Sequence, residues 1–148
     1  MKLVVAPVGR VKEAEVRAVL DDYYGRIRRY AELAEVELKD DRDDRVVAQF
    51  DRSIAAQGPR AELVTLEIEG RPLSSEAFAE RLGALLDRAA VPVFALGGAD
   101  GLPEAVRARS RWRLSLSAMT LPHRLARIVL AEQLYRAFTI LRGEPYNR

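Results

Sequence analysis

Residues Trp112–Leu125, which read WRLSLSAMTLPHRL, decide how the rest of this sequence is interpreted. Trp112, Leu114 and Leu116 alternate with polar residues, which is the period of a β-strand with one buried face. A loop of small residues follows, and Pro122 separates this loop from a long helical pattern. In open α/β sheets, ligands bind where strands end in loops beside the starts of helices. The stretch therefore predicts a ligand-binding crevice.

Strands and helices alternate along the whole chain. Strands are predicted at Lys2–Val8, Ala34–Leu38, Glu62–Ile68, Val91–Leu96 and from Trp112, and helices at Glu13–Tyr30, Val46–Gln57, from Ser74 or Ser75 to Ala89, at Pro103–Arg109 and at His123–Leu141. Lys39–Arg45 is expected to be a charged loop, and Gly70-Arg71-Pro72 is expected to turn the chain. Because each crossover is long enough to join parallel strands, the pattern predicts an α/β fold with a doubly wound, mostly parallel sheet. We expect residues 1–148 to form a single domain.

The composition excludes several kinds of site. The sequence has no cysteine and one histidine, His123. Disulfides, thiolate nucleophiles and cysteine-ligated zinc are therefore excluded, and a histidine-based metal site is not expected. An oxygen-ligated Mg²⁺ site stays open on composition alone, but we predict no metal. No apolar run approaches the roughly 20 residues of a membrane span, so we expect a soluble, cytoplasmic protein with no membrane partner.

Positive charge is carried almost entirely by arginine, although the net charge is only +2. Arginine forms bidentate contacts with phosphate. Arg107, Arg109, Arg111 and Arg113 recur at every second residue, so those on one side of a strand form a basic edge. Phosphate binding and ordinary solvated surface charge both fit this pattern.

The last predicted helix is apolar around more than one face. Its apolar residues are Leu125, Ala126, Ile128, Val129, Leu130, Ala131, Leu134, Tyr135, Ala137, Phe138, Ile140 and Leu141. A helix with one buried stripe shows a narrower apolar arc. A symmetric homodimer would cover the second face, and burial within the monomer core is the alternative.

Two loops are candidate binding sites. GGADG (Gly97–Gly101) follows a fully apolar strand, and glycine lets a backbone approach a ligand closely. It matches neither the dinucleotide fingerprint nor a phosphate-binding P-loop, so a simple turn fits equally well. The other loop ends at His123, which suits a general base, a phosphate contact or a residue hydrogen-bonded at the helix start.

Four segments together resemble one protein family. They are VTLEIEGRPLSSE (Val64–Glu76), FALGGADGL (Phe94–Leu102), SLSAMTLPHRLARIVLAEQLYRAF (Ser115–Phe138) and RGEPY (Arg142–Tyr146). They look like the RlmH (formerly YbeA) family of SPOUT-class 23S rRNA methyltransferases, and the resemblance covers the chain end to end. It implies an α/β-knot fold with a C-terminal trefoil knot, and a homodimer.

The resemblance also implies a reaction. The methyl donor would be S-adenosylmethionine (SAM), and the acceptor would be N3 of pseudouridine 1915 in helix 69 of 23S rRNA, within the assembled ribosome. The implied cofactor-binding residues are Leu66, Gly97, Leu116, Ser117, Ala118, Met119, Thr120 and Leu121. Loop backbone groups would read the adenine edge, the leucines would cover its faces, and Gly97 would admit the ribose or methionine part.

Methyl transfer to N3 also requires loss of a proton, so a general base or a group that stabilises the developing oxyanion would help. His123 and Tyr146 are the available groups, and Arg142 and Arg148 are the candidates for RNA phosphate contacts. Family members usually carry Tyr-His near the end of the tail, whereas this chain has Asn147 after Tyr146. Asparagine keeps a hydrogen bond but is not a base near neutral pH. A non-catalytic ribosome- or RNA-binding module is therefore the alternative, and an unrelated nucleotide-binding α/β enzyme is a third possibility without a fingerprint.

Overall fold

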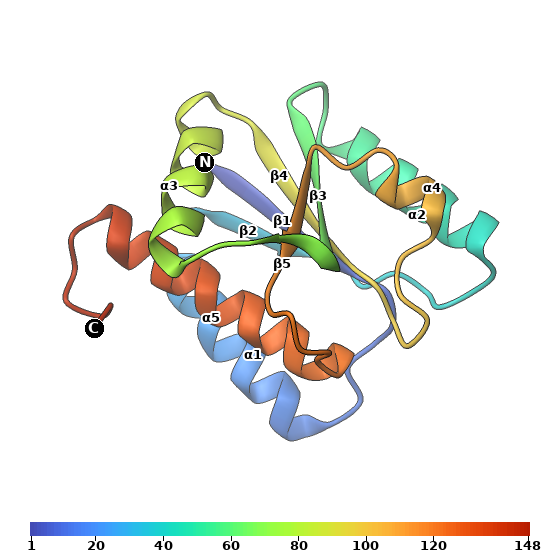
Figure 1. The fold of residues 1–148 in the computed structure, drawn as a ribbon, viewed down its shortest axis with the longest axis horizontal. Coiled ribbons are helices and arrows are strands. Elements are labelled where there is room, and N and C mark those ends of the chain that lie inside the picture. The colour runs from blue at the N-terminus through green and yellow to red at the C-terminus, as the bar shows by residue number, and fades with distance from the viewer.

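A computed structural model describes all residues, Met1–Arg148, and Figure 1 shows its fold. In chain order these are β1 (Lys2–Pro7), α1 (Ala14–Ile27), β2 (Glu32–Glu35), α2 (Asp43–Ala56), β3 (Ala61–Pro72), α3 (Ser75–Asp87), β4 (Val91–Leu96), α4 (Glu104–Arg107), β5 (Trp112–Ser115) and α5 (His123–Leu141). Every strand and helix expected from the sequence is present.

The strands form one parallel sheet in the order β2-β1-β4-β3-β5. Helices α1, α3 and α5 cover one face of the sheet, and α2 and α4 cover the other (Figure 1). A core cluster lies on each face, because the central strands β1 and β4 are apolar on both sides. The predicted α/β class with a mostly parallel sheet is confirmed.

Strand β3 is longer than the sequence suggested. The predicted turn at Gly70–Pro72 is wrong, because the strand continues to Pro72 with a register shift between Leu66 and Arg71. Its second half crosses β5 (Figure 1), and a Cβ on Gly70 would lie 2.8 Å from the carbonyl carbon of Leu114. Glycine is needed there because the backbones of the two strands approach closely. A glycine within a strand looks in the sequence like a glycine in a turn, so the sequence alone does not distinguish the two. The trefoil knot implied by the family resemblance stays a prediction.

Two smaller boundaries also differ. Strand β2 begins at Glu32 and ends at Glu35, earlier than the predicted Ala34–Leu38. Helix α2 begins at Asp43, inside the stretch expected to be a loop. Asp43 and Asp44 lie in its first turn, where negative charge stabilises the positive end of the helix dipole.

Helix α5 packs against both α1 and α3. Leu130 and Leu134 are 0% exposed within the single chain. The monomer core therefore covers most of the apolar arc, as the alternative explanation required, and this arc alone does not call for a second copy. Leu125 is 49% exposed and Leu141 44%. None of the helices is both long and apolar enough to cross a membrane.

Candidate functional site

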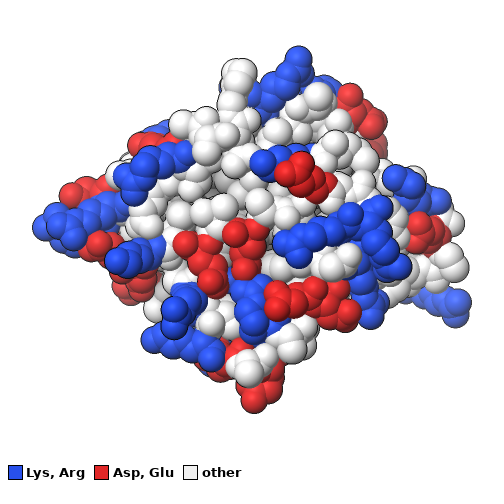
Figure 2. All heavy atoms as spheres, turned by 180° about the vertical axis from the view of Figure 1, so that it is seen from behind, with Lys and Arg blue, Asp and Glu red and all other residues white.

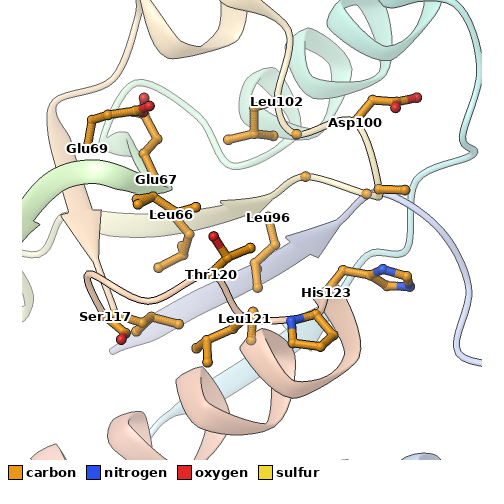
Figure 3. Close-up of a pocket in the computed structure, with 18 of the residues that line it drawn as sticks. Leu66, Glu67, Glu69, Leu96, Asp100, Leu102, Ser117, Thr120, Leu121 and His123 are labelled. Carbon is orange, nitrogen blue, oxygen red and sulfur yellow. The ribbon is translucent and has the colours of Figure 1, made fainter.

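A cavity of about 530 Å³ lies where the middle of β3 and the carboxyl ends of β4 and β5 meet the start of α5 (Figure 3). Three segments form most of its wall: residues 66–69, the GGADG loop with Leu96 and Leu102, and residues 116–123. Parallel strands bring their carboxyl ends to one edge of the sheet, so segments far apart in the sequence meet there. The volume lies within the range of small-molecule and cofactor sites.

Most of the predicted cofactor residues line this one cavity. They are Leu66, Gly97, Leu116, Ser117, Met119, Thr120 and Leu121. Ala118, the remaining member of the predicted set, lies in the same loop but does not line the cavity. In Figure 3, Leu66 and Leu96 face the loop residues Thr120 and Leu121. These side chains form an apolar slot suited to a flat ring.

The loop between β5 and α5 holds itself in place with few internal hydrogen bonds. Ser115 donates its hydroxyl to the carbonyl of Ser117 at 2.9 Å, and the amide of Met119 donates to the hydroxyl of Ser117 at 3.0 Å. The amides of Thr120 and Leu121 have no partner within the protein. Backbone N–H groups at the cavity edge are therefore available to a ligand with acceptor atoms.

The structure requires glycine at position 97 for a different reason from the one that the sequence suggested. A Cβ at this position would lie 2.4 Å from the carbonyl carbon of Gly101 and 2.7 Å from the amide nitrogen of Leu102. The absent side chain therefore makes room for the loop's own backbone. The GGADG loop folds back tightly on Gly97, and this turn shapes the cavity wall.

Glu67 forms a buried, charged part of the wall that the sequence analysis missed. Its side chain is 3% exposed and accepts hydrogen bonds from Arg113 at 2.6 and 2.8 Å and from the Thr65 hydroxyl at 2.6 Å. Burial alone would raise the pKa of this carboxyl, but the Arg113 and Thr65 hydrogen bonds outweigh it, and the pKa lies below its ordinary value. Glu67 is therefore a carboxylate that fixes Arg113 across β3 and β5.

Two further carboxylates lie at the cavity edge. Glu69 and Asp100 are exposed, line the cavity from different segments, and are visible in Figure 3. Arg107 is the cationic lining residue; it pairs with Glu104 and lies 3.8 Å from Glu67. Both residues lie in segments singled out from the sequence, Asp100 in GGADG and Glu69 in Val64–Glu76, but no role for either carboxylate follows from the sequence. Only the folded chain reveals that they share a site.

His123 is exposed and lines the cavity. Its imidazole points away from Leu66 and Ser117 in Figure 3, and it lies in the first turn of α5 without a side-chain cap on the helix. No hydrogen bond from the His123 side chain to the start of the helix supports the interpretation of this histidine as a helix cap. An accessible imidazole at the cavity edge is available for proton transfer or phosphate contact.

Tyr146 lies away from the cavity, near the other end of α5. Its ring packs edge-on against Tyr135, with ring centroids 4.7 Å apart, and its hydroxyl donates to Glu132 at 3.0 Å. Burial and this hydrogen bond raise the pKa of Tyr146 to about 12. His123 and Tyr135 are twelve residues apart on the helix, which places them about 18 Å apart along its axis. One chain therefore does not bring the two catalytic candidates together.

The rest of the tail is also tied to the far end of α5. The side-chain oxygen of Asn147 accepts from Arg136 at 3.1 Å, and its nitrogen donates to Glu76 at 3.0 Å. A side-chain amide can accept from one partner and donate to the other, which explains why asparagine suits position 147 structurally. Arg142 stacks over the ring of Tyr30 at 5.6 Å, and the terminal Arg148 is exposed. Neither predicted RNA contact lies at the cavity.

The alternating arginines do not form a free basic edge. Arg107 and Arg113 pair with Glu67, Arg109 pairs with Asp51, and only Arg111 has no ion-pair partner. Positive and negative side chains are likewise interspersed over the face shown in Figure 2. The pattern therefore mostly reflects local charge pairing.

A buried ion cluster supports the start of α5 beside the cavity. Arg127 is 3% exposed and donates to Glu35 at 3.0 Å, to Glu37 at 2.8 Å and to the carbonyl of Gly9 at 3.3 Å. Arg17 of α1 joins the cluster by pairing with Glu35 at 2.7 Å. Burial alone would raise the pKa of Glu35, but its arginine partners lower it below its ordinary value. The cluster fixes α5 to the carboxyl ends of β1 and β2.

Comparison with known proteins identifies the family to which this arrangement belongs. A sequence model described as "Predicted SPOUT methyltransferase" matches residues 1–147. The chain belongs to the SPOUT methyltransferase family. This bears out the resemblance of the four segments quoted above.

Several full-length relatives of this SPOUT protein share one name, ribosomal RNA large subunit methyltransferase H. The protein from Sorangium cellulosum is 50% identical, with 99% of each chain covered. The one from Anaeromyxobacter dehalogenans is 42% identical over the whole of both chains, and that of Rhodospirillum centenum is 43% identical, with 100% of this chain and 99% of the relative covered. The similarity thus includes the cavity segments and the tail alike.

A solved structure shares the fold. It is the SpoU methyltransferase AviRb from Streptomyces viridochromogenes, crystallised with the cofactor AdoMet. The TM-score is 0.50 at 13% identity, and the match covers 97% of this chain and 61% of AviRb. At this identity the match supports the fold of the SPOUT domain and nothing finer.

Proposed function

We propose that the protein transfers a methyl group from SAM to large-subunit ribosomal RNA. The observation that carries the proposal is the single cavity in which Leu66, the GGADG loop and residues 116–121 meet. The names of the full-length relatives support ribosomal RNA as the substrate. The AdoMet bound by AviRb supports the cofactor.

The finer proposal concerns the acceptor atom. The four-segment resemblance to the RlmH family supports N3 of pseudouridine 1915 in helix 69 of 23S rRNA, with the assembled ribosome as the partner. An acceptor base that reaches the cavity meets residues 116–123 on one side and Glu69 on the other. His123 lies at this edge, where a proton from N3 would have to leave.

The residues present fit SAM. Leu66, Leu96 and Leu121 offer an apolar slot for adenine, and the free amides of Thr120 and Leu121 can donate to its ring nitrogens. Glu69 and Asp100 are exposed carboxylates at the edge of the cavity, and their charge favours a cofactor that carries a sulfonium and an ammonium group.

SAM supplies an electrophilic methyl group on sulfur when it is bound. The cavity residues then contribute mainly by positioning, because an in-line displacement needs the acceptor nitrogen held against the methyl carbon. His123 is the imidazole that lines the cavity, and we assign it the role of accepting the N3 proton. Tyr146, with its raised pKa, stays protonated and can donate a hydrogen bond to a developing oxyanion.

We further propose a homodimer in which the tail of one protomer serves the cavity of the other. Helix α5 starts beside the cavity and ends beside the tail, so two antiparallel α5 helices would place each tail next to the partner's cavity. A two-fold axis makes both contacts at once. Leu125, half exposed near the start of α5, is available for this contact.

The direct test uses labelled SAM and ribosomes from a strain that lacks the modification. Incorporation of label at pseudouridine 1915 is expected, with ribosomes that already carry the methyl group as the control. A folded protein that binds SAM but labels neither ribosomes nor free rRNA would refute the transfer reaction. A protein that binds ribosomes but not SAM in calorimetry would instead be the non-catalytic module, an alternative kept open by Asn147 at the family's usual histidine position.

The dimer is tested by mixing two inactive variants. Gly97→Val damages the cavity and Tyr146→Phe removes the tail hydroxyl. If the tail acts on the partner's cavity, a mixed dimer contains one complete site, so the mixture should be more active than either variant alone. A mixture no more active than its components, although sedimentation shows mixed dimers, would contradict the shared site.

A further inference from the structure

A second pocket opens at the opposite edge of the sheet, beside the amino ends of β3 and β5. Its volume is about 310 Å³, its polar lining consists of Glu62, Arg81, Arg88 and Arg111, and Trp112 contributes to its apolar wall. Arg81 and Arg88 lie within and just after α3, and Trp112 is the first residue of β5. It shares no residue with the cofactor cavity. Three guanidinium groups therefore surround one carboxylate in a place to which the proposed reaction assigns no role.

The positive charge of this second pocket is not balanced. Arg88 uses both terminal nitrogens to bind Glu62, with Nη2 2.8 Å from Oε2. Arg81 and Arg111 are exposed and have no carboxylate partner of their own. Burial and the charge of Arg71 lower the pKa of Arg81. Three guanidinium groups and one carboxylate leave the pocket with excess positive charge, which a bound anion would offset.

Trp112 orients one of the free cations. The guanidinium carbon of Arg81 lies 4.5 Å from the centroid of the indole ring, which is itself 3% exposed. Stacking on an aromatic face leaves the N–H groups at the edge of a guanidinium free to donate. The indole N–H of Trp112 also has no acceptor within the protein. The pocket thus offers hydrogen-bond donors that have no partner, on an Arg81 guanidinium that Trp112 already holds in place.

We propose that this second pocket binds a phosphate group of an RNA backbone. The fork of a guanidinium matches the oxygens of a phosphate and binds them in pairs. The choice of RNA as the source of the phosphate rests on the proposed function. Edge strand β5 links the two pockets, since Trp112 lines one and Leu116 the other. These residues are about 13 Å apart along the strand, so an RNA bound at the cofactor cavity can reach this pocket within a few nucleotides.

The test measures RNA binding and its salt dependence for Arg111→Gln and Arg81→Gln. Each change should weaken binding of a short RNA hairpin about three- to tenfold and should lower the slope of log K against log salt by about 1, because one phosphate contact is lost. Arg52→Gln is the matched control, since Arg52 is an exposed arginine of α2 with no ion-pair partner. Slopes and affinities equal to those of Arg52→Gln would overturn the proposal.

The only tryptophan of the chain reports on this pocket directly. Binding of the hairpin should change Trp112 fluorescence in the wild type and in Arg52→Gln, and the change should shrink in Arg111→Gln. Unchanged emission with RNA demonstrably bound would contradict an RNA contact here. Inorganic phosphate that competes at concentrations equal to those of the RNA phosphates would instead indicate a small-anion site and refute the RNA assignment.

The outcome can be separated from that of the methyl transfer. Both arginine variants should keep wild-type SAM affinity in calorimetry, because neither residue lines the cofactor cavity. RNA binding that depends on Arg111 but is accompanied by no transfer would refute the proposed function and leave this pocket standing. Methyl transfer by both variants, with RNA binding that does not depend on Arg81 or Arg111, would support the proposed function and refute this pocket as an RNA contact.

Discussion

The two ends of α5 are built on different principles. At its amino end, a loop with free backbone amides and the GGADG turn leave a cavity open beside His123. At its carboxyl end, Tyr146 and Asn147 are closed onto the helix by Tyr135, Glu132, Arg136 and Glu76. The shape of the backbone creates the ligand-binding cavity at the amino end, whereas side-chain contacts hold the tail in place at the carboxyl end. Substitutions at the loop and turn of the first end should therefore change cofactor binding, whereas substitutions in the tail at the second end should leave cofactor binding unchanged.

The largest expected effect comes from removing the buried cation that supports the amino end. Arg127→Met leaves Glu35 and Glu37 without their buried partner, which should cost about 3 kcal/mol of unfolding free energy. Urea denaturation measures the loss. Arg124→Met is the control on the same helix, because its ion pair with Glu13 is solvent-exposed and should be worth less than about 1 kcal/mol. Equal losses in the two variants would show that the cluster does not support this end.

Gly97→Val should follow in size. The added Cβ collides with the backbone of Gly101, so the turn must shift, and we expect SAM affinity to fall about 100-fold, or about 3 kcal/mol. Calorimetry measures the affinity. Gly98→Ala in the same loop is the control, since its Cβ would meet nothing closer than 3.5 Å and should change the affinity little. Normal SAM binding by Gly97→Val would separate this turn from the cofactor site.

Glu67→Gln should have a moderate effect that depends on pH. The folded-state pKa of Glu67 is lowered, so its stabilisation is fully present above the ordinary value of 4.5 and is lost as the pH falls through the lower folded value. The variant should lose about 1–2 kcal/mol at neutral pH and should show a shallower acid loss than the wild type. Urea unfolding at several pH values tests this. Glu69→Gln, with an exposed carboxylate, should follow the wild-type curve.

Tyr146→Phe should have the smallest effect on the isolated protein. It removes one hydrogen bond to Glu132 and keeps the packing on Tyr135, so we expect a loss of about 1 kcal/mol or less in stability and unchanged SAM affinity. Methyl transfer should nevertheless fall, because the hydroxyl is proposed to act on the partner's cavity. Wild-type methyl transfer by Tyr146→Phe would show that the Tyr146 hydroxyl has only a structural role.

The sequence predicted the fold class because hydrophobic periodicity is a local property that survives without tertiary information. Strand boundaries failed where local and tertiary signals conflict. Gly70 and Pro72 are turn-forming residues by composition, but β3 passes over β5 at this point and uses Gly70 for close approach. The second face of α5 was ambiguous for a similar reason, since apolar residues such as Leu134 do not specify whether the same chain or another copy covers them.

The sequence by itself determined which segments could carry a site. It placed Gly97 and residues 116–121 just after strands, and a parallel sheet brings such strand ends to one edge, where Leu66 in the middle of β3 also lies. Only the tertiary structure decided which side chains complete the wall, because nothing in the motifs that contain Glu67, Glu69 and Asp100 shows that these carboxylates meet in one cavity. It also separated His123 from Tyr146, since a rigid helix of 19 residues holds its two ends apart whatever lies at either end.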